Sequence, residues 1–184
     1  MKKQQIAKAA LDCFTESGYE GASLAQIAEA VGLKKQSLYT HFADKDAIFL
    51  AALAYSKAEE MAFYEQFFSE ATAPLAEVLQ QFLLQLVALF RTSRPQQFWL
   101  RVNFYPPPHL AAVVEQEVAA IYEASEHHFL ALFTRHQEQL TVTPQMATDA
   151  FIGVINASLA ELLYNTKASK WQASFAVFWR GITT

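Results

Sequence analysis

The segment SLAQIAEAVGLKKQSLYTHF, residues 23–42, decides the fold of the amino-terminal region. Ser23 precedes an apolar stripe and is followed three residues later by Gln26, which is the pattern of a capping box at a helix start. Gly32 stands where that helix has to end, because a sharp turn needs the positive φ that glycine adopts at low cost. A second short helix follows the glycine, so the segment predicts a helix-turn-helix.

The second helix of this motif has two different faces. Leu38 and Phe42 lie four residues apart on one face, and Gln36 and Thr40 lie on the opposite face. We expect a helix of eight or nine residues, which is shorter than the roughly 12–15 residues that an isolated helix needs. The apolar pair must therefore hold it against the rest of the region, which leaves the polar face free to enter a DNA groove.

Positive charges surround the polar face of this helix. Lys34 and Lys35 begin the helix, Lys45 follows it, and no carboxylate occurs between Val31 and Ala43. The attraction of DNA phosphates is therefore locally unopposed. The whole chain has a formal charge of -4, but residues 1–50 hold as many Lys as Asp and Glu together, so the acidic excess belongs to the rest of the chain.

The region from about Lys3 to Phe49 resembles the TetR-type (tetracycline-repressor-like) transcriptional regulators of bacteria. The resemblance is carried by FTESGYEGASLAQIAEAVG and by GLKKQSLYTHFADKDAIF, which share one glycine. It implies a head that binds double-stranded DNA, with phosphate contacts from Ser23, Ser37, Tyr39, His41 and Lys45, and base contacts from Lys35, Gln36 and Thr40. Lys34 departs from the usual Ser or Thr cap and adds a charge, and Thr40 departs from the usual aromatic residue.

Two alternatives to DNA binding stay open at this point. The segment is either an ordinary structural hairpin, or an incidental part of a helical bundle that binds small molecules or catalyses a reaction. The sequence holds no glycine-rich phosphate loop, nucleophile elbow or catalytic triad pattern. His127 and His128, with Glu123 and His136, do not converge on a metal-binding pattern. We therefore expect no catalytic residue, no metal and no cofactor.

The composition predicts a folded, all-α protein of about nine helices. The chain has 184 residues, 53% of them hydrophobic, with only five Gly and six Pro, and no segment alternates like a strand. We expect a helix-turn-helix DNA-binding domain over 1–48 and a helical regulatory domain, for ligand binding and dimerisation, over 49–184. The helices expected beyond the head run from Asp44, as cap, to about Ser69, from Pro74 through LAEVLQQFLLQLVALF, from Gln96 to Tyr105, from His109 to Gln137, from Thr143, as cap, to Tyr164, and from Ser169 to Gly181.

The cellular location is expected to be the cytoplasm, with no membrane contact. No run of 18 or more uninterrupted apolar residues occurs, and Lys8 and Asp12 interrupt the only stretch that resembles a signal peptide. The single cysteine, Cys13, fits a reducing compartment. We expect this side chain to be buried in the head.

Aromatic residues gather after residue 60 and predict a pocket for a small apolar or aromatic effector. Three polar residues in apolar surroundings would orient that ligand by hydrogen bonds. Plain core packing is the alternative for each aromatic side chain. The candidate ligand-binding residues are Tyr64, Phe82, Phe98, Trp99, Arg101, Asn103, Phe129, Phe133, Phe151 and Asn156.

The last two helices are predicted to form a homodimer interface, as the resemblance also implies. One carries a stripe of small residues and the other an apolar stripe, and a reader of palindromic DNA needs two copies. The alternative is that both stripes close the core of a single chain. The candidate interface residues are Gly153, Ala157, Ala160, Trp171, Phe175, Phe178 and Ile182. A ligand would then act by shifting the long helix after Asp44 and so the spacing of the two heads.

Overall fold

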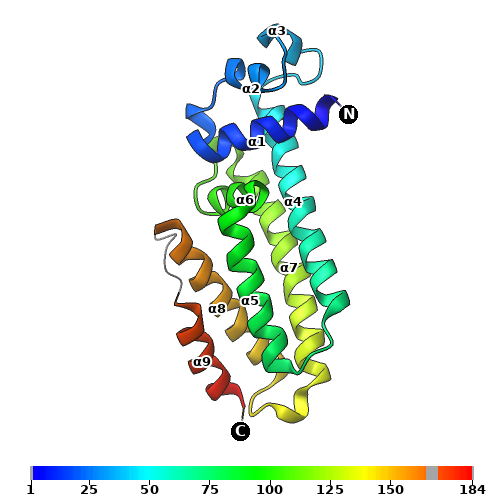
Figure 1. Ribbon diagram of the computed structural model, residues 1–184, viewed down its shortest axis with the longest axis vertical. Coiled ribbons are helices and arrows are strands. Elements are labelled where there is room, and N and C mark those ends of the chain that lie inside the picture. Colours follow the sequence, from blue (N-terminus) through cyan, green and yellow to red (C-terminus); the bar gives the residue numbers. More distant parts are fainter. Residues whose placement is uncertain (1, 165–169, 184) are drawn as a thin grey trace. The chain divides into compact units, whose positions relative to one another are not determined.

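The computed structural model describes residues 2–164 and 170–183. In these ranges the chain forms nine α-helices and two short 3₁₀ helices, and an isolated bridge between Leu140 and Thr183 is the only pairing of the β type (Figure 1). The predicted all-α class and the predicted number of helices are confirmed. The predicted start of the last helix at Ser169 lies outside the described residues.

The chain divides into two compact units, each built from two segments. The first unit contains residues 1–61 and 93–118, and the second contains residues 62–92 and 119–184. Two helices, α4 (Lys45–Glu70) and α7 (Ala111–Arg135), contribute residues to both units. The boundary expected between residues 48 and 49 separates the chain by function, and it stays a prediction.

The first unit is built around three phenylalanine rings from three helices. Its elements are α1 (Lys2–Gly21), α2 (Leu24–Ala30), α3 (Lys35–Leu38), the first turns of α4, α6 (Arg94–Phe104), the 3₁₀ helix η1 (Pro108–Leu110) and the start of α7. Phe49 of α4 lies with its ring centroid 5.3 Å from that of Phe14 in α1 and 5.6 Å from that of Phe98 in α6. All three rings are buried, so α6 completes the core of the region that carries the helix-turn-helix.

Polar contacts also fasten α6 to α1. The Arg101 guanidinium donates a hydrogen bond from Nη1 to the carbonyl oxygen of Thr15 at 3.3 Å, and Arg94 Nη2 lies 2.7 Å from Glu16 Oε1. Gly18 interrupts the helical geometry of α1 with a φ of 71°, and a Cβ added there would lie 2.9 Å from Arg101 Nη2. Glycine is therefore required for the backbone conformation, and its missing side chain leaves room for the guanidinium.

Two of the predicted helix caps are confirmed by hydrogen bonds. Asp44 Oδ1 accepts the Ala47 N–H at 2.7 Å at the start of α4, and Thr143 Oγ1 accepts the Met146 N–H at 3.2 Å at the start of α8 (Pro144–Tyr164). These side chains satisfy N–H groups that have no partner within the helix. The helix expected from His109 begins instead as η1, because the prolines before it favour a tight turn, and it becomes α-helical at α7.

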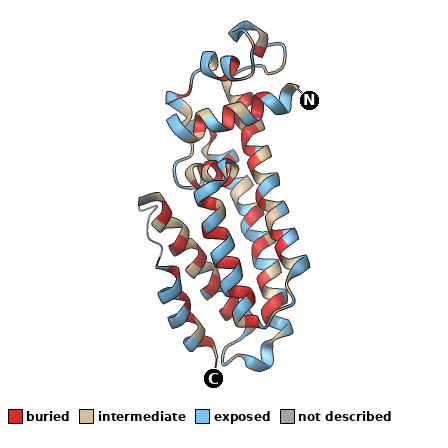
Figure 2. Ribbon diagram, in the orientation of Figure 1, coloured by how far each residue is buried: buried red, intermediate tan, exposed pale blue. Residues whose placement is uncertain are grey.

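The second unit has an interlocked aromatic core. It contains α5 (Leu75–Thr92), α8, α9 (Trp171–Ile182), the later turns of α4 and most of α7. The Phe129 ring centroid lies 4.9 Å from that of Phe82 and 5.0 Å from that of Phe151, and all three side chains are fully buried. Figure 2 shows α5 with a buried stripe and an exposed stripe, so this helix has one solvent-facing side.

One helix is markedly apolar and only partly covered. The segment Pro144–Leu163 is, among the described residues, the one helix long and apolar enough to cross a membrane by length and composition. Only 33% of its most apolar window is buried within the chain. The other described positions of α8 are half-buried or exposed in a single copy of the protein, and Met146, Ala150, Gly153 and Ala157 are the exposed ones among its apolar and small residues.

Candidate nucleic-acid interface

The start of the helix-turn-helix has the predicted capping box. Ser23 Oγ accepts the Gln26 N–H at 3.2 Å, and Gln26 Oε1 accepts the Ser23 N–H at 3.0 Å. Ile27 and Ala28 are buried beneath this turn. The reciprocal bonds satisfy two donors at the helix start, so α2 has a fixed beginning.

The turn after α2 depends on Gly32. Its φ is 67°, and the Leu33 N–H returns to the Ala28 carbonyl oxygen at 2.8 Å. Lys2 Nζ donates to the Val31 carbonyl oxygen at 3.1 Å, a contact that the sequence pattern did not reveal. A cation at the carboxyl end of a short helix satisfies a free carbonyl group and complements the helix dipole.

The second helix of the motif is shorter than predicted. The α-helix covers only the four residues of α3, followed by a turn in which the Tyr39 N–H bonds to Gln36 O at 3.2 Å and the His41 N–H bonds to Leu38 O at 2.9 Å. These two bonds span three residues, as in a 3₁₀ helix, whereas the Phe42 N–H bonds to the Leu38 carbonyl oxygen at 3.0 Å over four residues. Lys34 makes no side-chain cap at the start. The uncapped start and the tightened end together account for the shortened helix.

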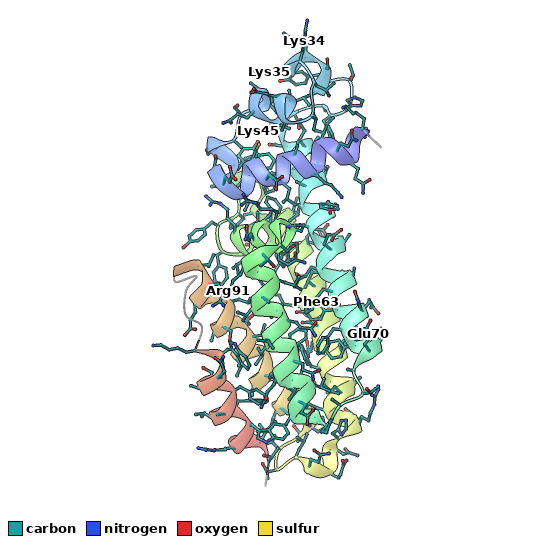
Figure 3. All side chains as sticks on the ribbon, viewed as in Figure 1. Lys34, Lys35, Lys45, Phe63, Glu70 and Arg91 are labelled. Carbon is teal, nitrogen blue, oxygen red and sulfur yellow. The ribbon has the colours of Figure 1, made fainter. Side chains whose placement is uncertain are left out.

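The exposed side of this segment carries most of the residues predicted to contact DNA. Leu38 is 1% exposed and anchors the segment, whereas Phe42 is half-buried with Lys3 Nζ 5.8 Å from its ring centroid. We call residues 34–42 the α3 segment, and Lys34 and Lys35 extend from it in Figure 3. The predicted DNA contacts that are exposed are Ser23, Lys34, Lys35, Gln36, Tyr39 and Thr40, and those that are half-buried are Ser37, His41 and Lys45.

Besides Ser23, two of the predicted contact residues have side-chain partners within the chain. Thr40 Oγ1 donates to the Ser37 carbonyl oxygen at 2.7 Å, which leaves the lone pairs of the hydroxyl for an outside donor. Lys45 Nζ lies 4.5 Å from the centre of the Tyr19 ring, a cation–π contact that holds the side chain near the start of α4.

A cluster of three polar side chains links three elements of the first unit by hydrogen bonds. Tyr19 donates a short hydrogen bond to Asp46 Oδ1, and His109 Nε2 lies 3.1 Å from the same oxygen. The two hydrogen bonds lower the pKa of Asp46, whereas burial and the neighbouring carboxylate raise the pKa of Tyr19. The cluster joins the end of α1, the start of α4 and η1. Sequence analysis missed it, because His109 is distant in the chain and only its position after three prolines marks it.

The predicted ligand-binding residues do not form one group. Phe98, Trp99, Arg101 and Asn103 lie on α6 in the first unit, where Phe98 and Arg101 contact the helix-turn-helix region. In the second unit Asn156 Oδ1 accepts a hydrogen bond from the Tyr122 hydroxyl at 3.0 Å. The other predicted residues of the second unit are core rings, namely Tyr64, Phe82, Phe129, Phe133 and Phe151. The contacts described for these rings are those of core packing, and a ligand site among them stays a prediction.

Two grooves of the second unit are lined by other residues. One has a volume of about 480 Å³ and lies between α4 and α5, lined by Phe63, Gln66, Phe67, Glu70, Ala71, Gln81, Gln85, Ala88, Leu89 and Thr92. The labels Phe63 and Glu70 mark its α4 side in Figure 3. The other has a volume of about 270 Å³ and includes His128, whose ring stacks on Phe68 at 4.7 Å. Neither groove contains a residue predicted to bind ligand.

The predicted dimer residues separate into a buried set and a more open set. Trp171, Phe175, Phe178 and Ile182 are between 4% and 9% exposed in a single chain, so the apolar stripe of α9 packs into its own unit. The role of this stripe in a dimer interface stays a prediction. Gly153 and Ala157 of α8 are exposed and Ala160 is half-buried.

Two side chains of the first unit differ from what the sequence indicates. Cys13 is half-buried rather than buried, and burial is the largest cause that raises the pKa of its thiol. Glu60 on α4 is only 3% exposed, and its Oε2 atom has no hydrogen-bond partner. Burial raises the pKa of Glu60 to about 7, although a hydrogen bond from Gln96 opposes this shift. No local pattern in the sequence marks this carboxyl group as buried.

Comparisons with known proteins agree with the helix-turn-helix. A family model described as "Bacterial regulatory proteins, tetR family" matches residues 6–52. The HTH-type transcriptional repressor AcnR of Corynebacterium diphtheriae is 44% identical over 62 residues, which are 34% of this chain and 32% of that protein. The chain therefore matches this relative over about a third of that protein's length.

Solved structures resemble the whole chain in fold. A TetR-family transcriptional regulator from Agrobacterium tumefaciens has a TM-score of 0.76 at 18% identity, covering 100% of this chain and 98% of that one. FadR from Bacillus subtilis, solved in complex with stearoyl-CoA, has a TM-score of 0.73 at 16% identity, covering 97% and 98%. The amino-terminal region of this chain thus matches the tetR family model of bacterial regulatory proteins, and the chain as a whole has the fold of the TetR-family structures.

Proposed function

We propose that this protein is a DNA-binding transcriptional repressor that binds a palindromic operator as a homodimer and leaves it when a small apolar or aromatic ligand binds. The exposed side of the α3 segment is the observation that carries the proposal. It presents Lys34, Lys35 and Gln36 to solvent, with no carboxylate between residues 31 and 43. Phosphate contacts would provide affinity, and a few base contacts would provide specificity.

Two side chains are suited to reading base edges. Gln36 matches the donor and acceptor pair of adenine in the major groove, and Lys35 matches the acceptors of guanine. Each well-formed contact of this kind is worth about 1–3 kcal/mol of discrimination. Tyr39, His41, Ser37 and Ser23 would bind phosphates, which adds affinity for every sequence alike.

Selection of bound duplexes from a random DNA pool tests this function. We expect a palindromic motif and an affinity that falls steeply as salt concentration rises. Gln36→Ala should relax the preference at one position of each half-site, whereas Gln80→Ala, an exposed glutamine of α5, should leave the motif unchanged. Absence of any sequence preference at moderate salt would contradict the proposal.

The open surface of the last two helices supports the homodimer. Gly153 and Ala157 are exposed on α8, Val177 of α9 is 73% exposed, and only 33% of the apolar window of α8 is buried. A second copy would cover these positions, because small residues let helices approach closely. Val177→Glu should yield monomers in sedimentation analysis and weaken operator binding, while Gln80→Glu should do neither.

The ligand-controlled step is proposed from the aromatic core and by analogy with the FadR structure in complex with stearoyl-CoA. A ligand that prefers one conformation of the protein changes operator affinity by the ratio of its own affinities for the two states. Couplings of about 1–3 kcal/mol give 5- to 150-fold changes. This function belongs in the cytoplasm of a bacterium and requires no catalytic residue. A panel of apolar compounds, scored by melting temperature and by operator affinity, tests this step.

A further inference from the structure

One carboxyl group in the first unit has no function in DNA binding and an unusual environment. Glu60 lies near the middle of α4, 3% exposed, with Oε2 lacking any hydrogen-bond partner. Buried polar atoms almost always have a partner, because leaving one unpaired costs free energy. An orphaned oxygen on a group that carries charge calls for an explanation beyond packing.

Two cations on the helices that meet near Glu60 are paired with other carboxylates. Lys57, one helical turn earlier on α4, has its Nζ 2.6 Å from Glu117 Oε2, and Arg94 at the start of α6 pairs with Glu16. Apart from burial, the hydrogen bond from Gln96 is the only influence on the pKa of Glu60. No described cation therefore compensates this carboxylate.

Polar side chains join the first turn of α6 to α4 by hydrogen bonds next to Glu60. Gln96 is 4% exposed and hydrogen-bonds to Glu60 through its side chain, and the Ser93 hydroxyl donates a short hydrogen bond to Gln96 Oε1. Ser56 Oγ donates to the Pro95 carbonyl oxygen at 2.6 Å. These contacts tie α6 to α4 at the same level as the unpaired oxygen.

We propose that Glu60 anchors the effector of this repressor through a basic nitrogen, which donates a hydrogen bond to Oε2 after displacing the first turn of α6. This proposal rests on the proposed function, because the effector is the small ligand that makes the repressor leave its operator. A protonated amine supplies the missing donor and also neutralises a charge that burial makes costly. A neutral alcohol supplies only a donor, and a carboxylate is repelled.

The same helix carries the effect to the DNA-binding region. On one side α6 contacts Glu60 through Gln96, and elsewhere Arg94, Phe98 and Arg101 hold α1 by an ion pair, ring contact and a hydrogen bond. Displacing the first turn of α6 from α4 shifts these contacts. Without ligand, the first turn of α6 is hydrogen-bonded to α4. Opening the site beside Glu60 therefore also changes the contacts of α6 with α1.

The test uses matched compounds that differ only in their polar group. The probes are phenethylamine, phenethyl alcohol and phenylacetate, and the larger naphthylmethylamine, naphthalenemethanol and naphthoate, titrated calorimetrically into the full-length protein without DNA. We expect at least one amine to bind more tightly than its alcohol and its acid. Its affinity should be about tenfold higher at about pH 8 than at about pH 6, because the ionised fraction of a group with a pKa of about 7 changes by that factor. The alcohols should show no such change.

Two variants separate the role of Glu60 from general charge effects. Glu60→Gln keeps the size of the side chain and should abolish both the amine preference and its pH dependence. Glu59→Gln removes the exposed neighbouring charge and should preserve both. Circular dichroism checks that each variant is folded. Equal binding of amines and alcohols by the wild-type protein in both series, or an amine preference that survives Glu60→Gln, overturns the proposal.

DNA binding is measured separately with the selected duplex. If the protein binds the duplex selectively but no amine is preferred, the inference about Glu60 fails and the proposed function stands. If the amine preference depends on Glu60 but no duplex is selected, the anchor stands and the repressor function fails. A bound amine that depends on Glu60 should weaken duplex binding at least fivefold in the wild-type protein and leave it unchanged in Glu60→Gln.

Discussion

The α3 segment and the aromatic core of the second unit are built in opposite ways. The segment contains four helical residues held by one buried leucine, and most of the neighbouring polar side chains are exposed. The core consists of phenylalanine rings in mutual contact, each fully buried. The proposed DNA contacts therefore lie where side chains contribute little to stability, so DNA affinity and stability should be alterable separately.

The largest effect is expected from the core. Phe82→Ala removes a fully buried ring and leaves a cavity, so the free energy of unfolding should fall by about 3–5 kcal/mol. Urea denaturation measures this change, with Gln80→Ala on the same helix as a near-neutral control. A loss below about 1 kcal/mol would mean that the core collapses around the gap. The aromatic core would then contribute no more to stability than the α3 segment is expected to.

A smaller effect concerns the buried charge of Glu60. Its pKa is raised from 4.5 to about 7, so between these values the folded protein binds more protons than the unfolded chain. Stability from this group is therefore full at acidic pH and decreases as pH rises, by an amount on the order of 3 kcal/mol. Denaturation across this pH range should show the decrease in the wild-type protein and in Glu59→Gln, and a flatter profile in Glu60→Gln.

Two glycines of the first unit offer a sharper contrast. Gly18→Ala and Gly32→Ala both place an alanine at positive φ. At Gly32 this costs about 1–2 kcal/mol. At Gly18, where ψ is 179°, the backbone lies in a region that essentially only glycine adopts, and the cost is about 1–3 kcal/mol. Gly18→Ala should cost about 1 kcal/mol more, because its Cβ would displace Arg101 from the Thr15 carbonyl, whereas nothing lies within 4 Å of a Cβ at Gly32. Thermal denaturation of both variants compares them, and equal losses would show that the Arg101 contact adds no stability.

The smallest effect is expected at the surface. Tyr39→Phe removes one exposed hydroxyl that is proposed to bind phosphate, so affinity should fall by about 1 kcal/mol for all duplexes alike. The melting temperature should not change. Fluorescence anisotropy with the selected duplex and a scrambled one measures both affinities. A loss confined to the selected duplex would assign Tyr39 to base reading instead.

Local signals in the sequence predicted the helix starts well. Ser23 with Gln26, Asp44 and Thr143 are caps whose chemistry is contained within four residues, and each makes the expected hydrogen bond. The length of α3 was overestimated because the periodicity of its apolar residues persists through a 3₁₀ turn. Spacing alone does not distinguish the two geometries over so few residues.

Local sequence patterns did not predict which helices pack against each other. The apolar stripe of α9 was visible, but the sequence does not say whether such a stripe faces its own chain or a partner. Phe98 and Arg101 were read as ligand contacts, because nothing near them in the sequence shows that α6 packs on α1. The burial of Glu60 likewise depends on residues that are distant in the chain.

The composition of the first unit has a practical consequence for protein engineering. Its core takes one ring from each of α1, α4 and α6, and α6 follows a separate stretch of more than thirty residues that belongs to the other unit. Grafting only the first 48 residues onto another regulator would leave Phe14 without both Phe49 and Phe98. A chimera that recognises this protein's operator therefore has to carry residues 93–118 along with the amino-terminal segment.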